Sequence, residues 1–136
     1  MYKLKLSVIS IMLCLLINPI AQANKDDINQ LLGEWQLDMT PENHEDDNFA
    51  LMHISSIADN KIQGDFYRKG VKIQQAQINQ QSNVLKAALI SEDNSGKYHS
   101  SFYLEGEKLI GTTHAIDRGF LAIWTAKKIK SYQVKN

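Results

Sequence analysis

From residue 34 to residue 128, apolar and polar side chains alternate in short runs that are separated by Gly, Asn, Asp or Ser. Alternation with a period of two residues is typical of β-strands that bury one face. The pattern predicts strands at residues 34–39, 49–57, 61–68, 71–79, 84–91, 97–105, 108–115 and 120–128. Because short turns join these strands, neighbours must run antiparallel, and a meander removes its exposed edges best by closing on itself. The sequence therefore predicts an all-β fold, a single eight-stranded antiparallel up-and-down barrel.

Residues 1–23 have the pattern of a signal peptide that is cleaved on export. Two lysines precede an uncharged, mostly apolar run over residues 6–17, and Ala21 and Ala23 supply small side chains where a signal peptidase reads them. A run of this length is too short to span a bilayer core of about 30 Å. We therefore expect one mature domain over residues 24–136, periplasmic or secreted, with no membrane span after cleavage.

The expected mature chain contains no cysteine, because Cys14 is the only one in the sequence. The domain must therefore be stabilised by its hydrophobic core, for which about 110 residues suffice. At its start, residues 26–32 are expected to form a short helical turn with Asp26 or Asp27 as the N-cap.

Charge and motifs narrow the functional classes. Without the two lysines of residues 1–23, acidic side chains outnumber basic ones by two, and the absence of a basic stripe argues against a nucleic-acid partner. The sequence contains no nucleophile elbow, zinc-protease helix, glycine-rich phosphate loop or cysteine nucleophile. We therefore expect a non-enzymatic protein without a metal or a cofactor. The alternative that stays open is an enzyme or a haem carrier that uses His53.

The turn over residues 105–108 predicts the register of its hairpin, because it fits a two-residue turn with glycine in the first position. The expected cross-strand pairs are Phe102 with Gly111, Ser100 with Thr113, Tyr103 with Ile110, and His99 with His114. The first two pairs face inward and the last two face outward, and we interpret the histidines as an exposed pair without a metal. A loop over residues 116–119 then places Trp124 across Gly111, beside Phe102.

Two more turns predict pairs on the other side of the barrel. The turn at Asp59-Asn60 sets His53 against Phe66, and the turn at Lys69-Gly70 sets Phe66 against Ile73. This register turns His53 into the barrel. An error of one residue would turn it outward, because successive side chains of a strand point to opposite faces.

The strand expected over residues 71–79 is less regular than the others. Plain alternation places Gln75 and Gln77 inward, whereas Ile78 is the residue that suits the core. We therefore expect a β-bulge in this strand, since one extra residue reverses the side to which the following side chains point.

The inward faces supply aromatic side chains and a few polar groups. An eight-stranded barrel is either filled by its own side chains or just wide enough for one small ligand, and the sequence leaves both open. Aromatic walls with a few convergent polar groups suit a small, partly apolar molecule. The candidate ligand-binding residues are His53, Phe66, Tyr98, Ser100, Phe102 and Thr113. The rest of the expected lining is Trp35, Leu37, Leu51 and Trp124.

The segment Leu32-Gly33-Glu34-Trp35 follows the expected helical turn and opens the first strand. In this respect the chain resembles the calycin barrels, which include lipocalins, fatty-acid-binding proteins and avidins, and the small lipocalin-like domains of exported bacterial proteins. The resemblance implies that Trp35 plugs one end of the barrel and that the basic end of the last strand, at Lys127-Lys128, covers it. It also implies that residues 40–48 form a lid.

A second functional reading comes from the outward faces of the last three strands. Four apolar side chains fall there: Tyr103, Ile110, Leu121 and Ile123. A monomer does not need such a cluster on a solvent-facing surface, so it indicates an interface. The alternative function is therefore a protein-interaction or inhibitor module that acts through these strands, with a protein partner or a second copy of the chain.

Overall fold

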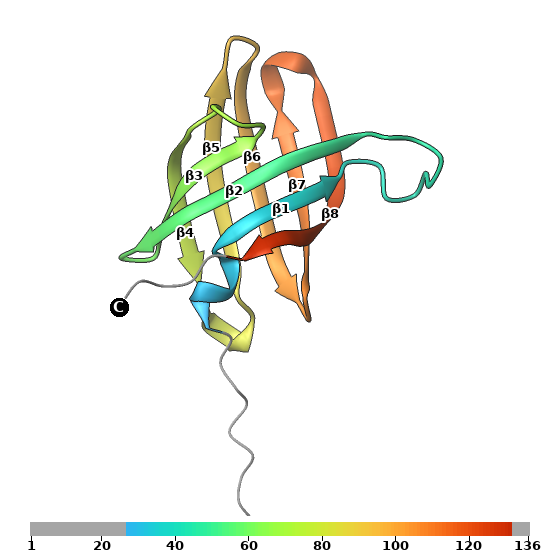
Figure 1. The fold of residues 1–136 in the computed structure, drawn as a ribbon. Coiled ribbons are helices and arrows are strands. Elements are labelled where there is room, and N and C mark those ends of the chain that lie inside the picture. The colour runs from blue at the N-terminus through green and yellow to red at the C-terminus, as the bar shows by residue number, and fades with distance from the viewer. Residues whose placement is uncertain (1–26, 132–136) are drawn as a thin grey trace, which may run out of the picture.

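The computed structural model describes residues 27–131, so the signal peptide predicted over residues 1–23 lies outside the described part of the chain. Eight antiparallel strands form one sheet in the order β3-β2-β1-β8-β7-β6-β5-β4, and the sheet curls into a barrel (Figure 1). The strands are β1 (Gly33–Asp38), β2 (Phe49–Ala58), β3 (Lys61–Tyr67), β4 (Ile73–Asn79), β5 (Lys86–Asp93), β6 (Gly96–Glu105), β7 (Lys108–Ala115) and β8 (Phe120–Ser131). Three short 3-10 turns accompany them: η1 (Ile28–Leu31), η2 (Gln81–Asn83) and η3 (Ile116–Arg118). The predicted fold class is confirmed.

The barrel is nearly closed, and its seam lies between β3 and β4. Every other neighbouring pair of strands forms a ladder, whereas one isolated bridge, between Asp65 and Lys72, joins these two. Two backbone hydrogen bonds hold the ends of the seam. The amide of Phe66 donates to the carbonyl of Val71 at 2.9 Å, and the amide of Ile78 donates to the carbonyl of Asn60 at 2.8 Å. The strands at the seam are thus tied at both ends.

The two ends of the barrel differ. We call the end that carries the β3–β4, β5–β6 and β7–β8 connections the mouth, and the opposite end, where η1 lies, the closed end (Figure 1). Asp27 caps η1, because its carboxylate accepts a hydrogen bond from the amide of Asn29 at 3.0 Å. This agrees with the predicted helical turn and its acidic N-cap.

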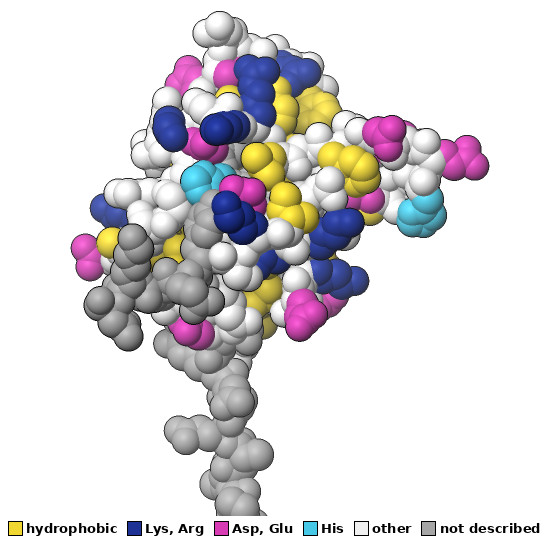
Figure 2. Space-filling model, in the orientation of Figure 1, with side chains coloured by type: hydrophobic (Ala, Val, Ile, Leu, Met, Phe, Trp, Pro, Cys, Tyr) yellow, Lys and Arg dark blue, Asp and Glu magenta, His cyan; other side chains and the backbone are white. Residues whose placement is uncertain are grey.

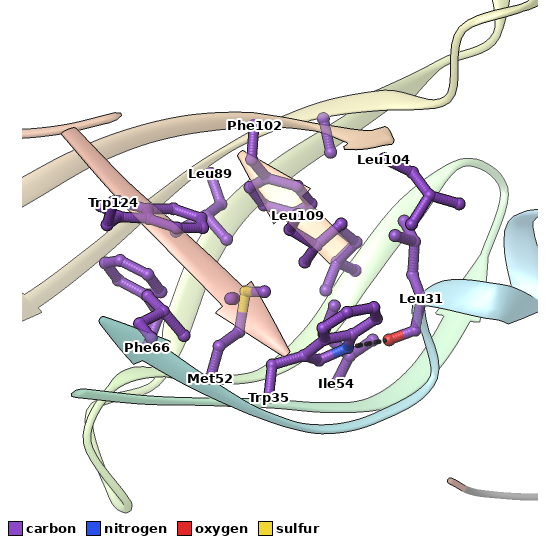
Figure 3. Packing of buried hydrophobic residues seen from close by; sticks show 14 of the residues in the cluster. Leu31, Trp35, Met52, Ile54, Phe66, Leu89, Phe102, Leu104, Leu109 and Trp124 are labelled. Carbon is purple, nitrogen blue, oxygen red and sulfur yellow. Dashed lines mark hydrogen bonds between the residues drawn. The ribbon is translucent and has the colours of Figure 1, made fainter. Parts of the chain in front are cut away.

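Trp35 and Lys128 fasten η1 to the closed end. The indole Nε1 of Trp35 donates to the carbonyl of Leu31 at 2.8 Å (Figure 3). The Lys128 ammonium lies 4.8 Å from the centroid of the indole ring and donates to the carbonyls of Gln30 and Leu32, the latter at 2.9 Å. It therefore satisfies carbonyls at the end of η1 while it covers the aromatic face. The contact between the first and last strands that the resemblance implied is present.

Aromatic rings fill the middle of the barrel (Figure 3). The centroid of the Trp124 indole lies 6.2 Å from the Phe66 ring and 5.9 Å from the Phe102 ring. The indole lies directly over Gly111, where an added Cβ atom would stand 2.5 Å from two of its ring carbons. The middle of the barrel is therefore occupied by packed aromatic side chains, one of the two arrangements that the sequence left open.

The register of the last three strands is the predicted one. Phe102 pairs with Gly111, Ser100 with Thr113, Tyr103 with Ile110 and His99 with His114, and Gly111 pairs with Trp124 on its other side. A two-residue turn leaves a hairpin no freedom to slip, so the β6–β7 pairs follow from the turn itself.

The predicted inward direction of His53 and Leu51 is wrong. The register between β2 and β3 shifts at Ser55, so His53 pairs with Asp65 rather than with Phe66. A bulge at this position reverses the faces, because two residues of one strand then oppose a single residue of the other. Met52 and Ile54 take the buried positions, while His53 and Leu51 are only partly buried and face outward.

The predicted pairing of Phe66 with Ile73 is also wrong. The bridge between Asp65 and Lys72 sets Phe66 against Val71, because the connection between β3 and β4 is tighter than expected. The predicted bulge in β4 is present, and the register with β5 shifts between Ile73 and Gln75. Past this bulge Ile78 is buried, as expected.

Candidate functional site

A hollow of about 160 Å³ opens at the mouth, above the aromatic core. It has an apolar wall from Met39, which follows β1, and from β2 and β8, and a polar edge from β3, β6, β7 and η3. We call it the mouth pocket. Its lining residues are Met39, Asn48, Phe49, Ala50, Tyr67, Tyr98, Thr113, Arg118 and Phe120. An apolar hollow with a few polar groups on one side is the usual form of a small-molecule site.

Two tyrosines form the centre of the polar edge. The rings of Tyr67 and Tyr98 have centroids 4.5 Å apart, and their hydroxyl oxygens are 3.2 Å apart. The Tyr98 oxygen also lies 3.2 Å from both carboxylate oxygens of Asp93, to which its single proton can be donated. Burial and the hydrogen bond with Tyr67 raise the pKa of the Tyr98 hydroxyl, so this group remains neutral.

Asp93 anchors the tyrosines from the outside of the mouth. Its carboxylate accepts hydrogen bonds from the amide of Ser95 at 2.8 Å and from the guanidinium of Arg68 at 2.9 Å. The Ser95 amide, the Tyr98 hydroxyl and the Arg68 charge together hold the pKa of Asp93 below its ordinary value. This carboxylate is therefore ionised, and both of its oxygens have hydrogen-bond partners.

Arg118 contacts the same Tyr98 hydroxyl as Asp93 and completes the polar edge. Its Nη1 donates to the Tyr98 hydroxyl at 3.1 Å and approaches the Tyr67 hydroxyl at 3.5 Å. The guanidinium carbon lies 5.7 Å from the centroid of the Phe120 ring. The hydrogen bond with Tyr98 raises the pKa of Arg118 above its ordinary value, so the side chain stays a cation.

The floor of the pocket is polar but already satisfied. The hydroxyls of Thr113 and Ser100 are 2.8 Å apart, and the indole Nε1 of Trp124 donates to Thr113 at 2.9 Å. These groups are buried, and burial of a polar group is tolerated when it has such partners. The floor therefore positions Trp124, and its polar groups already have partners within the protein.

The structure divides the predicted ligand-binding residues into three groups. Tyr98 and Thr113 line the mouth pocket. Phe66, Ser100 and Phe102 are buried but do not line it, because they belong to the packed core below. His53 lies on the outer wall, where its Nδ1 is 3.9 Å from the carboxylate of Asp65.

Asp65 is buried although its position on β3 faces outward. Its carboxylate accepts hydrogen bonds from the Lys72 ammonium at 2.7 Å and from the Gly70 amide at 3.2 Å. Burial works to raise the pKa of Asp65, but the contacts with Lys72, Gly70 and His53 outweigh it and lower the pKa. His53 thus belongs to a polar cluster that ties the β3–β4 connection to the wall, outside the mouth pocket.

The loop over residues 40–48 does not form the lid that the resemblance implied. It extends away from the barrel, and acidic side chains and a histidine occupy its outer part (Figures 1 and 2). Asp46 organises it, because its carboxylate accepts hydrogen bonds from Thr40 at 2.6 Å and from the amide of Asn48 at 3.3 Å. Only residues at the base of the loop, Met39 and Asn48, reach the mouth pocket.

Sequence reasoning found only Tyr98 and Thr113 among the pocket residues and missed the rest, which are Met39, Asn48, Phe49, Ala50, Tyr67, Arg118 and Phe120. They come from connections or strand ends that are far apart in the sequence, so no local spacing marks them. One signal was available: in an up-and-down barrel alternate connections meet at the same end. The segments that follow β3, β5 and β7 therefore had to meet at the mouth, and their aromatic and charged side chains with them.

The predicted interface residues lie on the outer surface. Leu121 and Ile123 are 69% and 65% exposed, and Tyr103 is 39% exposed. A groove of about 720 Å³ crosses this face, with Tyr103, Ile110 and Ile123 among its apolar lining. Small residues such as Ala88 and Ser101 form part of its lining.

Within residues 27–131, no three histidine, cysteine or acidic side chains come together in a way that would hold a metal ion. The same part of the chain contains no helix with the length and hydropathy needed to cross a membrane. Comparison of the chain with protein-family models, with curated proteins and with solved structures finds no match. Its function is therefore inferred from the barrel and the mouth pocket.

Proposed function

We propose that this protein is an exported, non-enzymatic barrel that binds a small, partly apolar molecule in its mouth pocket. The observation that carries the proposal is a hollow of about 160 Å³ with apolar walls on one side and Tyr67, Tyr98 and Arg118 on the other. A cavity of about 150 Å³ in another protein is known to hold benzene, so this volume suits a ligand of that size.

The packing of the barrel supports this choice of site. The closed end is blocked by Trp35 and Leu31, and the middle is filled by the rings around Trp124. A ligand that entered from solvent would therefore stop at the mouth, where Phe120 and Met39 offer apolar contacts. The hydrogen-bonded tyrosines hold the polar edge in place before a ligand arrives, which reduces the entropy lost on binding.

Export and a lipocalin-like character belong to the same proposal. Residues 1–23 carry the pattern of a signal peptide, which supports a periplasmic or secreted location. The Gly33-Glu34-Trp35 opening and the position of Lys128 over Trp35 support a calycin-like barrel. In such a barrel a mouth pocket is a natural ligand site.

Filling the mouth pocket is expected to weaken binding of a neutral probe. Benzyl alcohol is titrated into the mature protein, and backbone amide shifts near Tyr98 and Phe120 are followed by NMR. Because a ring at position 50 would occupy the hollow that Ala50 lines, Ala50→Phe is expected to raise the dissociation constant by about tenfold or more. Ala58→Phe, at the exposed far end of the same strand, is the matched control and is expected to leave binding unchanged.

A smaller substitution at the same position is the second variant of this test. Ala50→Leu fills less of the hollow and serves if the phenylalanine variant fails to fold. Wild-type protein that shows no saturable shifts at the mouth, or an Ala50 variant that binds as well as the Ala58 variant, would contradict the proposal.

The outer face supports a second candidate function, a protein-docking surface. Tyr103, Ile110 and Ile123 line the groove, and Leu121, two residues from Ile123 on the same strand, is exposed as well. In a two-fold contact between identical chains the same patch meets its own copy, so the exposed apolar side chains of each copy can be covered by the other. We propose a second copy of the chain as the occupant.

Ile123→Glu is expected to disrupt this self-association, because it places an unpaired charge at the centre of the contact. Light scattering over a concentration series measures the effect, and the dimer dissociation constant should rise by about tenfold or more. Ile129→Glu changes another exposed isoleucine of the same strand, outside the groove, and should have no effect. A wild-type chain that stays monomeric at millimolar concentration would rule out the second copy.

A further inference from the structure

We propose that the mouth pocket selects ligands that carry a carboxylate, and that Arg118 is the residue that recognises this group. The inference rests on the proposed function and specifies its ligand class. Three features of the mouth carry it: the position of Arg118, the engagement of the nearby acidic side chains, and the apolar wall that faces the guanidinium.

Arg118 lines the pocket as a cation whose contacts are with neutral groups. Its hydrogen-bond partners are the hydroxyls of Tyr98 and Tyr67, both reached through Nη1. Within the described residues, no carboxylate lies within ion-pair distance of it. A guanidinium carries five N–H donors in a planar fork, so most of them remain available for an anionic oxygen pair.

The acidic groups nearest to Arg118 have other partners. Asp93 accepts from Arg68, Ser95 and Tyr98, so Tyr98 stands between this carboxylate and the Arg118 guanidinium. The carboxylate of Asp117 turns toward the start of β6, where it lies 3.4 Å from the amide of Lys97. At the mouth, Arg68 therefore forms an ion pair with Asp93, whereas Arg118 forms no ion pair within the described residues.

The surroundings of Arg118 suit both the charged group and the apolar part of a ligand that carries a carboxylate. The tyrosine hydroxyls fix one edge of the guanidinium, and Phe120 lies along it at 5.7 Å, so the side chain is oriented without a counter-charge. Phe120, Phe49 and Met39 line the space beside it. A carboxylate on the guanidinium would place an attached ring or short chain among these apolar side chains.

The experiment compares benzoate with benzyl alcohol, which have similar size but differ in charge. Wild-type protein is expected to bind benzoate about tenfold or more tightly than benzyl alcohol, because charge-assisted hydrogen bonds to a guanidinium are stronger than neutral ones. Arg118→Gln removes the charge and the Nη1 donor but leaves a polar side chain at this position. It should weaken benzoate binding by about the same factor and weaken benzyl alcohol binding clearly less, because only the carboxylate loses a charge-assisted hydrogen bond.

Lys69→Gln is the matched control, because it removes a positive charge from the exposed β3–β4 connection at the same end of the barrel without touching the pocket. It should leave the preference for benzoate intact. Equal weakening by the Lys69 and Arg118 variants, or equal wild-type affinity for both probes, would overturn the selection for carboxylates and leave the mouth pocket itself standing. Failure of both probes to bind wild-type protein would overturn the proposed function and this inference with it.

Discussion

Replacing Gly111 by alanine is expected to lower the free energy of unfolding by about 3 kcal/mol, the upper part of the range for overpacked cores. The added Cβ atom would stand 2.5 Å from two ring carbons of Trp124 and 2.8 Å from the Cβ atom of Phe102. The indole is fully buried, and its Nε1 donates to Thr113 at 2.9 Å, so it cannot move aside without loss of that hydrogen bond. Denaturant unfolding followed by circular dichroism measures the effect.

A double-mutant cycle assigns the cost to this contact. Trp124→Phe shortens the ring over Gly111 and destabilises the barrel on its own, because it removes the hydrogen bond to Thr113 and leaves a void. With room made, the alanine should cost less, so the double variant is expected to be more stable than the sum of the single effects by about 1 kcal/mol or more. Additive effects would contradict the packing described for Gly111.

The same glycine shows why much of the fold follows from the sequence. The turn over residues 105–108 has two residues between its flanking strands, which fixes every pair of the β6–β7 ladder. Phe102 then falls opposite Gly111, and a glycine beside a large ring is a favourable arrangement in a sheet. Local geometry and core packing agree in this hairpin, so its inward and outward faces were predicted correctly.

The β2–β3 hairpin shows where the same reasoning fails. The turn at Asp59-Asn60 was placed correctly, but the bulge at Ser55 reversed the faces beyond it and moved His53 to the outer wall. Gly64 was the signal, because a glycine inside a strand often marks a bulge or a close backbone approach. Its φ is +153°, and a Cβ atom there would stand 1.8 Å from the carbonyl oxygen of His53.

The candidate site was less predictable than the fold for a different reason. Tyr98 and Thr113 were found because they alternate inward on regular strands. Arg118 lies in η3, and Tyr67 ends β3, so neither has a strand neighbour that fixes its direction. What brings them together is the curvature of the whole sheet, which places the ends of β3 and β7 around one opening (Figure 1).

Replacing Trp35 by alanine is expected to destabilise the barrel by about 4 kcal/mol, within the range for truncation of a buried tryptophan. Trp35 is almost fully buried at the closed end, where it receives the Lys128 ammonium on its face and donates to Leu31 from its edge. Its loss would leave a void beneath η1 and remove the hydrogen bond that holds the turn. Thermal and denaturant unfolding measure the effect.

Trp35→Phe separates the two contributions of this side chain. Phenylalanine retains most of the buried ring but cannot donate to the Leu31 carbonyl, so it should cost about 1 kcal/mol from the hydrogen bond and a further, smaller amount from packing. Tyr103→Ala removes a partly exposed aromatic ring from the outer wall and should cost less than about 1 kcal/mol. Trp35 lies buried at the closed end, whereas Tyr103 lies on the outer wall. A Trp35→Ala variant no less stable than Tyr103→Ala would therefore show that η1, rather than the indole, seals the closed end.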